Sequence, residues 1–220
     1  MTYLLIPGAG CTPWHWHPLT EELERRGQQV IPVDLPCDDP TAGLSTYVET
    51  VVNSYFEFAD EPGELVVVAH SLGGMTAPLV CDQLPVDLLV FVAGMVPAPG
   101  ERLREWWGNT EYEWKDGDAD AFFHDLPAAF AAEARRQLRV QAEGMLDDPS
   151  PMEVWPEVPT RAVIARDDRL FPPAFLRRVT EQRLGFAPTV MSGAHFPMLS
   201  HPTELADLLE GWRQAKPTVA

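Results

Sequence analysis

The sequence predicts an α/β fold in which helices flank a mostly parallel central sheet on both sides. Short apolar runs alternate with amphipathic segments along most of the chain, and the runs are continuously apolar. Strands that are buried on both faces of a parallel sheet require such runs. One stretch, residues 97–159, interrupts the alternation, which resumes after it. We therefore expect one core domain, residues 1–96 and 160–220, with a helical insertion at 97–159.

Six apolar runs are the expected strands. They cover residues 3–6, 30–33, 65–69, 88–93, 162–165 and 189–191. Most are rich in Val, Leu and Ile and are too short to be core helices. Because helical segments separate them, the strands should run parallel, with right-handed crossover connections.

Two amphipathic segments in the first half of the chain are expected helices. The first covers about residues 14–26 and should end at Gly27, since glycine readily adopts the left-handed conformation that closes a helix. The second lies between the expected strands at 30–33 and 65–69 and has apolar residues on one helical face. Thr46 and Glu49 have the spacing of a capping box at its start.

Two further helices are expected later in the chain. One covers about residues 72–83 and contains Pro78, which should cost a hydrogen bond to the Gly74 carbonyl and kink the helix. The other begins at Pro202, a favourable residue in a first helical turn. Its buried stripe consists of Leu205, Leu208, Leu209 and Trp212.

The interrupting stretch 97–159 is rich in aromatic residues and contains no convincing strand. It holds four of the seven tryptophans in the chain, namely Trp106, Trp107, Trp114 and Trp155. Since the sheet pattern resumes at about residue 162, we interpret the stretch as a helical insertion at one edge of the sheet.

The composition restricts the partners and the compartment. A net charge of −17 opposes binding to nucleic acid or to an anionic membrane surface. The three cysteines lie far apart without a Cys-x-x-Cys pair, which favours free thiols in a reducing compartment. No basic leader and no run of about 18 apolar residues is visible, so we expect a cytoplasmic protein. The aromatic insertion could support a homodimer, although the sequence does not require one.

The stretch VVVAHSLGGM, residues 66–75, places Ser71 between a buried strand and an expected helix. A sharp turn there would expose the hydroxyl at the carboxyl edge of the sheet. Small neighbours let the two backbones approach, and Ala69 and Gly73 satisfy this need. The Leu72 amide would then point toward developing negative charge. We interpret Ser71 as a nucleophile; the alternative is a serine that caps a helix.

A serine nucleophile needs a base and an orienting acid. His195 is the best candidate among six histidines, because it lies in a loop after the last strand. His70, beside the serine, should point away from it by strand alternation. Asp167 and Asp168 follow the strand at 162–165 and compete for the acid's role, although either could cap a turn or a helix. The order serine, acid, histidine fits successive loops at one sheet edge.

The loop after the first strand, residues 7–16, contains two glycines and can expose its amides to a ligand. The N–H of Ala9 is the candidate second donor to an oxyanion. The alternative is a plain glycine turn that leads into a helix. His15 and His17 lie in the same loop region without a third ligand, so we expect no metal site.

The motifs AHSLGG, DDRLFPP and GAHFPMLSHP resemble the α/β-hydrolase superfamily over nearly the whole chain. LLIPGAGCTPWHWHPL and IPVDLP resemble, more narrowly, its plant methyl-ester esterase and hydroxynitrile lyase branch, although Pro7 replaces the usual histidine of the first loop. The resemblance implies that Ser71 is the nucleophile and His195 the general base and acid. Asp168 would be the orienting carboxylate, since it precedes the Arg-Leu-Phe-Pro run.

The same resemblance implies that the amides of Ala9 and Leu72 form the oxyanion hole and that 97–159 is the lid. Hydroxynitrile lyases of the branch carry a lysine and a threonine where this chain has Phe196 and Gly8, which favours ester cleavage. The expected pocket residues are Gly8, Trp106, Trp107, Phe123 and Phe196, although many lid aromatics could simply pack the lid onto the core.

The implied function is a serine hydrolase that cleaves a small, largely apolar carboxylic ester through an acyl-enzyme and needs no cofactor. The first alternative is the same triad used by a lyase, an acyltransferase or a cyclase in small-molecule biosynthesis. The second is a receptor-like protein that binds a small apolar ligand with little turnover. Fold alone does not separate these.

Overall fold

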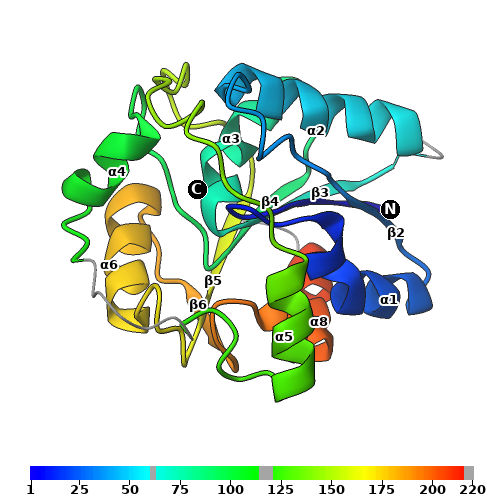
Figure 1. Cartoon of the computed structure of the whole chain (residues 1–220). Coiled ribbons are helices and arrows are strands. Elements are labelled where there is room, and N and C mark those ends of the chain that lie inside the picture. The colour runs from blue at the N-terminus through cyan, green and yellow to red at the C-terminus, as the bar shows by residue number, and fades with distance from the viewer. Residues whose placement is uncertain (60–62, 114–120, 216–220) are drawn as a thin grey trace.

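The computed structural model describes residues 1–59, 63–113 and 121–215, so Trp114 lies outside the described residues (Figure 1). Six strands form one sheet in the order β2-β1-β3-β4-β5-β6, and every strand pairing in the described ranges is parallel. The strands are β1 (Thr2–Ile6), β2 (Gln29–Pro32), β3 (Leu65–His70), β4 (Leu88–Val92), β5 (Thr160–Ala165) and β6 (Thr189–Met191). The predicted α/β fold is confirmed, with each strand within two residues of its expected position.

The carboxyl ends of the central strands lie level with one another. Ala69 in β3 pairs with Ile6 in β1 and with Phe91 in β4, and Phe91 pairs in turn with Ala162 in β5. Ala165 pairs with Met191 at the end of β6. Because parallel strands all point the same way, the loops after β1, β3, β5 and β6 emerge along one edge of the sheet.

Two helical layers cover the sheet (Figure 1). One face packs on α2 (Leu44–Phe58), α3 (Ala77–Val80) and α6 (Pro173–Leu184), and the other packs on α1 (His17–Arg25) and α8 (Pro202–Gln214). Strand side chains alternate between the two cores: Leu4 and Val67 belong to the first, and Leu5 and Val68 to the second. Burial on both faces explains why the strands are continuously apolar.

The helix starts and ends differ in part from the prediction. The expected first helix consists of a 3-10 turn, Pro13–Trp16, followed by α1, and Gly27 lies just beyond it with a φ of +78°. The predicted capping box at Thr46 and Glu49 is wrong, because α2 already begins at Leu44. The N–H of Leu44 donates to Asp148 Oδ2 at 2.8 Å, so a carboxylate of the insertion supplies the acceptor.

The continuous helix expected over 72–83 is also wrong. A 3-10 turn, Ser71–Met75, is followed by the short α3, and Pro78 occupies the second position of α3. Glycines are poor helix formers, and proline lacks an N–H, so this sequence favours a new start over a continuous helix. Pro78 therefore interrupts no long helix.

The chain between β4 and β5 contains α4 (Leu103–Asn109) and α5 (Ala128–Arg136). Leu103 and Trp106 of α4 join the core on the side of α2, whereas Ala131 and Ala134 of α5 join the core on the side of α1. The insertion therefore contacts both helical layers, and it passes over the edge of the sheet where the strands end (Figure 1).

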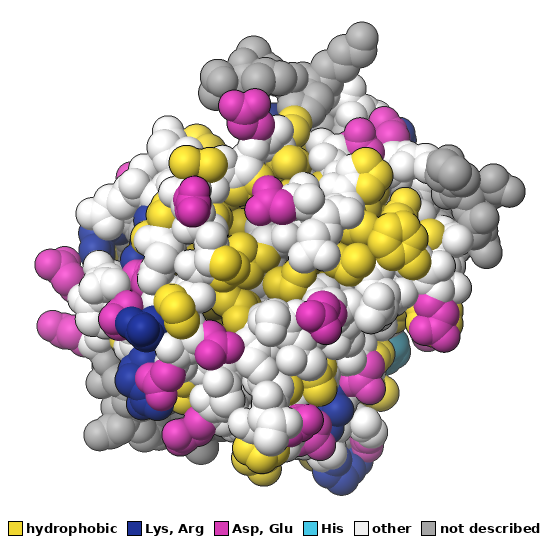
Figure 2. Space-filling model, turned by 90° about the horizontal axis from the view of Figure 1, so that it is seen from above, with side chains coloured by type: hydrophobic (Ala, Val, Ile, Leu, Met, Phe, Trp, Pro, Cys, Tyr) yellow, Lys and Arg dark blue, Asp and Glu magenta, His cyan; other side chains and the backbone are white. Residues whose placement is uncertain are grey.

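The face that carries α2 combines apolar and acidic side chains, with Lys and Arg toward the edges of the view (Figure 2). A groove of about 420 Å³ is lined by α2, the end of α3 and the insertion, and its lining includes Glu49, Asp82 and Asp148.

None of the helices in the described ranges has the length and apolar composition that a bilayer span requires.

Candidate active site

Ser71 lies at a sharp turn between β3 and the 3-10 helix that follows it. Its φ of +49° is unusual for a residue with a side chain, and the residue is 7% exposed. A Cβ at Gly73 would lie 2.6 Å from the Pro7 carbonyl oxygen, and one at Gly8 would lie 3.0 Å from Ser71 Cβ. Glycine at both positions therefore allows the first loop to approach the serine closely.

Ser71, His195 and Asp168 form one hydrogen-bonded row. His195 Nε2 lies 3.0 Å from Ser71 Oγ, and His195 Nδ1 lies 2.8 Å from Asp168 Oδ2. When Nδ1–H donates to the carboxylate, Nε2 is left to accept the serine hydroxyl. Both His195 and Asp168 are buried, so this geometry is shielded from water.

The Asp168 carboxylate is held by the backbone of its own loop. Its Oδ1 accepts the N–H groups of Leu170 at 2.9 Å and Phe171 at 2.8 Å. Asp167, the competing candidate, is exposed on the surface. The structure therefore brings Asp168, and not Asp167, to the histidine.

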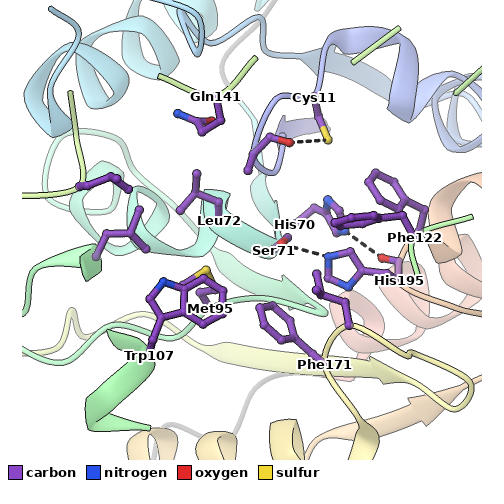
Figure 3. Close-up of a pocket in the computed structure, with 15 residues that line it drawn as sticks. Cys11, His70, Ser71, Leu72, Met95, Trp107, Phe122, Gln141, Phe171 and His195 are labelled. Carbon is purple, nitrogen blue, oxygen red and sulfur yellow. Dashed lines mark hydrogen bonds between the residues drawn. The ribbon is translucent and has the colours of Figure 1, made fainter. Parts of the chain in front are cut away.

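Ala9 and Leu72, whose N–H groups are the predicted oxyanion donors, both line the same cavity as Ser71. Figure 3 shows Leu72 near Ser71. Leu72 stands in the first turn of a 3-10 helix, where N–H groups have no intrahelical acceptor. Within the described ranges, no hydrogen bond uses the N–H of Ala9 or Leu72. Both remain available to a ligand oxygen.

The cavity has a volume of about 240 Å³ and a largely apolar lining. Besides Ser71 and His195, its lining residues are Ala9, Cys11, His70, Leu72, Met95, Leu103, Trp107, Phe122, Gln141, Leu146, Leu170, Phe171 and Phe196. The insertion contributes several of these side chains and the sheet-edge loops contribute most of the others. None of the described lining residues is Lys, Arg, Asp or Glu.

Two of the predicted pocket residues, Trp107 and Phe196, line this cavity, and three do not. Trp106 is fully buried in the core, where its Nε1–H donates to the Val96 carbonyl at 2.9 Å. Phe123 lies behind Phe196, with ring centroids 4.6 Å apart. Gly8 is covered by the side chains of His70 and Ser71. Trp106 and Phe123 therefore pack within the core, and Gly8 allows the first loop to lie close to His70 and Ser71.

His70 belongs to the site, and the prediction that it points away is wrong. It lines the cavity, and its Nε2 lies 2.9 Å from the carbonyl oxygen of His195 (Figure 3). The ring centroids of the two histidines are 4.9 Å apart. Strand alternation misled the prediction because the loop that carries His195 and Phe196 folds over the face of β3 that His70 occupies.

The predicted pocket residues did not include Phe122, Phe171 or Gln141, which line the cavity. Phe171 follows the acid and packs edge-on against the His195 ring, with centroids 5.3 Å apart. The DDRLFPP motif contained this residue, so its position beside the acid was a usable signal. Phe122 and Gln141 lie in the insertion, where no motif marked them.

Buried histidines make the stability of the fold sensitive to acid. Burial lowers the pKa of His15, and burial together with nearby His195 holds the pKa of His70 well below its usual range. In the unfolded chain both would bind protons near pH ~6.5. The unfolded state therefore gains protons that the folded state does not as the pH falls below about 6.5, and stability decreases.

We expect His70→Gln to lose less stability than the wild type when the pH falls from 7.5 to 5.5. The difference should be about 1 kcal/mol, the linkage contribution of one histidine. Glutamine retains an N–H donor for the His195 carbonyl but does not titrate. Urea unfolding at both pH values measures the effect. Equal losses in the two proteins would contradict it.

Residues 3–208 match the model of the alpha/beta hydrolase family. Among curated proteins, methylesterase 7 of Arabidopsis thaliana is 29% identical over an alignment that covers 43% of this chain and 40% of that protein. Methylesterase 3 of the same plant is 24% identical and aligns over 94% of this chain and 93% of that protein. The family model covers most of the chain, and the alignment with methylesterase 3 covers nearly all of it.

A solved structure of polyneuridine aldehyde esterase has the same fold. It superposes with a TM-score of 0.81 at 19% identity and covers 96% of this chain and 98% of that one. The two chains therefore share the same overall fold.

Proposed function

Because the chain belongs to the alpha/beta hydrolase family, we propose that Ser71, His195 and Asp168 are a catalytic triad that hydrolyses a small, largely apolar ester. In reaction class the chain is a carboxylic-ester hydrolase, as its methylesterase relatives indicate. One observation carries the finer proposal. The serine hydroxyl, the imidazole and the carboxylate stand in a single row at 3.0 and 2.8 Å, beside a cavity with two available amides.

The geometry supports the following reaction. Ser71 Oγ bonds to the ester carbonyl carbon while its proton moves to His195 Nε2. The carbonyl oxygen becomes negative and accepts hydrogen bonds from the N–H groups of Ala9 and Leu72. His195 then protonates the alcohol oxygen, and the bond between carbon and that oxygen breaks to leave an acyl-serine. A water molecule gives a proton to the same nitrogen and attacks the acyl carbon. His195 returns that proton to Ser71 Oγ as the bond between the carbon and Oγ breaks, which releases the acid and restores Ser71.

Asp168 supports this cycle by holding the imidazole. Its Oδ2 accepts Nδ1–H of His195, which fixes the tautomer that leaves Nε2 free to take the serine proton. The negative carboxylate also stabilises the imidazolium formed in each half of the cycle. The two backbone N–H groups on Oδ1 keep the carboxylate from rotating away.

The lining of the cavity defines the proposed substrate class. Aromatic and aliphatic side chains dominate, and the described lining residues include no Lys or Arg that could pair with an anionic group. The net charge of −17 further opposes anionic substrates and polyanionic partners. We therefore propose a neutral ester with an apolar acyl or alcohol group as substrate, with no cofactor required.

A panel of esters tests this function. Neutral esters with aryl or short alkyl groups should be hydrolysed, and a matched ester that carries a carboxylate should show a kcat/KM at least tenfold lower, because its charge must be desolvated in an apolar cavity. Product analysis by mass spectrometry identifies the acid and alcohol.

Equal kcat/KM for the charged and neutral esters would contradict the proposed substrate class. Cleavage of a cyanohydrin without any ester hydrolysis would instead favour a lyase. Phe196 argues against that reaction, because it places an aromatic ring rather than an amine beside the catalytic histidine.

A further inference from the structure

Gln141 belongs to the insertion, but its side chain reaches the loop after β1. The N–H of Gly10 donates to Gln141 Oε1 at 3.1 Å. On the other side of the same residue, the N–H of Arg139 donates to the Gly10 carbonyl at 2.8 Å. Gly10 has a φ of +65°, and a Cβ there would overlap the Arg139 carbonyl oxygen. Residues 139–141 therefore hold Gly10 from both sides.

The amide of Gln141 is itself fixed by two more contacts. Its Nε2 donates to the hydroxyl of Tyr47 and to the Ala142 carbonyl, both at 3.0 Å. Tyr47 is buried in α2, so the core of the protein anchors the far side of the amide. Only one amide orientation satisfies all three contacts, because Gly10 can only donate and the Ala142 carbonyl can only accept.

Gly10 directly follows the residue that we assign to the oxyanion hole. Figure 3 shows Gln141 on the same side of the cavity as Cys11, the residue that follows Gly10. The loop contains glycines at positions 8 and 10, which on their own would let its peptide planes rotate. An oxyanion hole works only when its donors are oriented before the reaction begins.

We propose that Gln141 is a positioning residue for the oxyanion hole: its amide fixes Gly10, and thereby aims the Ala9 N–H at the space beside Ser71. The inference rests on the proposed function and adds a role for the insertion. Besides covering the cavity, the insertion completes the part of the site that stabilises negative charge.

Replacing Gln141 with methionine tests the proposal, since methionine has a similar length but offers the Gly10 N–H only a weak sulfur acceptor and has no donor for Tyr47. We expect kcat for a neutral ester to fall about 10- to 100-fold with KM within about threefold of the wild type. The rate of fluorophosphonate labelling of Ser71 should fall in parallel. Gln182→Met, at an exposed position of α6, is the matched control and should leave all three values unchanged.

Two outcomes with Gln141→Met would overturn the proposal. One is a kcat within twofold of the wild type in a folded variant. The other is a rise in KM alone, which would make Gln141 a substrate contact, because its side chain also lines the cavity. Thermal unfolding and circular dichroism report whether the variant is folded.

Gln141→Glu gives a second, independent readout. It tests the positioning role of Gln141 even if the methionine variant fails to fold. A protonated glutamic acid can accept from Gly10 and donate to Tyr47, and it loses only the donation to the Ala142 carbonyl. The ionised form places a negative charge near the developing oxyanion. We therefore expect the ratio of variant to wild-type kcat to fall as the pH rises from 5 to 9. A ratio that stays near one throughout contradicts the proposal, and Gln182→Glu is the control.

The wild type separates failure of this inference from failure of the proposed function. If the wild-type protein neither hydrolyses the ester panel nor labels at Ser71, the proposed function fails. If the wild type is active and both variants at Gln141 match it, only the role of Gln141 is refuted.

Discussion

Ser71→Ala is expected to lower kcat for ester hydrolysis by about 10⁴- to 10⁶-fold, to near the background rate. The change removes the only oxygen that His195 Nε2 contacts in the described structure, at 3.0 Å, and with it the covalent step. The cavity and both oxyanion amides stay in place, so substrate binding should persist. Initial rates with a neutral ester measure the effect against Ser45→Ala, a control at an exposed position of α2.

A Ser71→Ala variant that retains more than a tenth of wild-type kcat would show that hydrolysis does not use this serine. Loss of activity in Ser45→Ala as well would point to a general effect on the fold. Because Ser71 adopts a positive φ, alanine at this position meets the same backbone strain as serine. The thermal unfolding temperature should therefore change little.

Asp168→Asn is expected to lower kcat by about 10⁴-fold while the protein stays folded. The asparagine Oδ1 can still accept the N–H groups of Leu170 and Phe171, so its amide NH₂ must face His195 Nδ1. That contact favours the imidazole tautomer with a proton on Nε2, which cannot accept the serine proton. The loss should appear in kcat more than in KM.

Asp167→Asn is the matched control, because the two aspartates are neighbours in the chain and only Asp168 is buried. We expect its kcat to stay within about twofold of the wild type, as for most exposed positions. Equal losses in both variants would mean that charge near the loop, and not the contact with His195, supports activity.

The core of the fold was predictable because its signals are local. Each strand is a short apolar run that is buried on both faces, and each run ends in a recognisable break. One rule, that parallel strands present their carboxyl ends at one edge, predicted that Ser71 and His195 would meet there with either Asp167 or Asp168. The resemblance to the α/β-hydrolase superfamily then favoured Asp168. The structure brings these residues into contact, and their catalytic roles remain predictions.

The cavity could not be predicted in the same way, because its lining depends on how the insertion folds over the sheet. That path is set by contacts between distant residues, such as Asp148 with Leu44 and the Trp106 indole with the Val96 carbonyl. An aromatic residue in the insertion can face the core or the cavity, and composition does not distinguish the two. Trp106 and Trp107 are adjacent in the chain, but Trp106 lies in the core and Trp107 lines the cavity.

The predicted start of α2 was wrong for a related reason. The spacing of Thr46 and Glu49 is a valid capping pattern, but a carboxylate from a segment about 100 residues away meets the helix at Leu44 instead. Gln141 carries no motif at all, since a lone glutamine becomes informative only when its three partners are known. Tertiary contacts of this kind leave no local pattern to read.

Mass spectrometry after treatment with a fluorophosphonate tests the central claim most directly. An activated serine displaces fluoride and keeps the phosphonyl group, so the intact mass should rise by one adduct, and peptide mapping should place it on Ser71. Ser71→Ala should remain unlabelled, and Asp168→Asn should label far more slowly. An unmodified wild-type protein, or an adduct on a different residue, would contradict the assignment of Ser71 as the nucleophile.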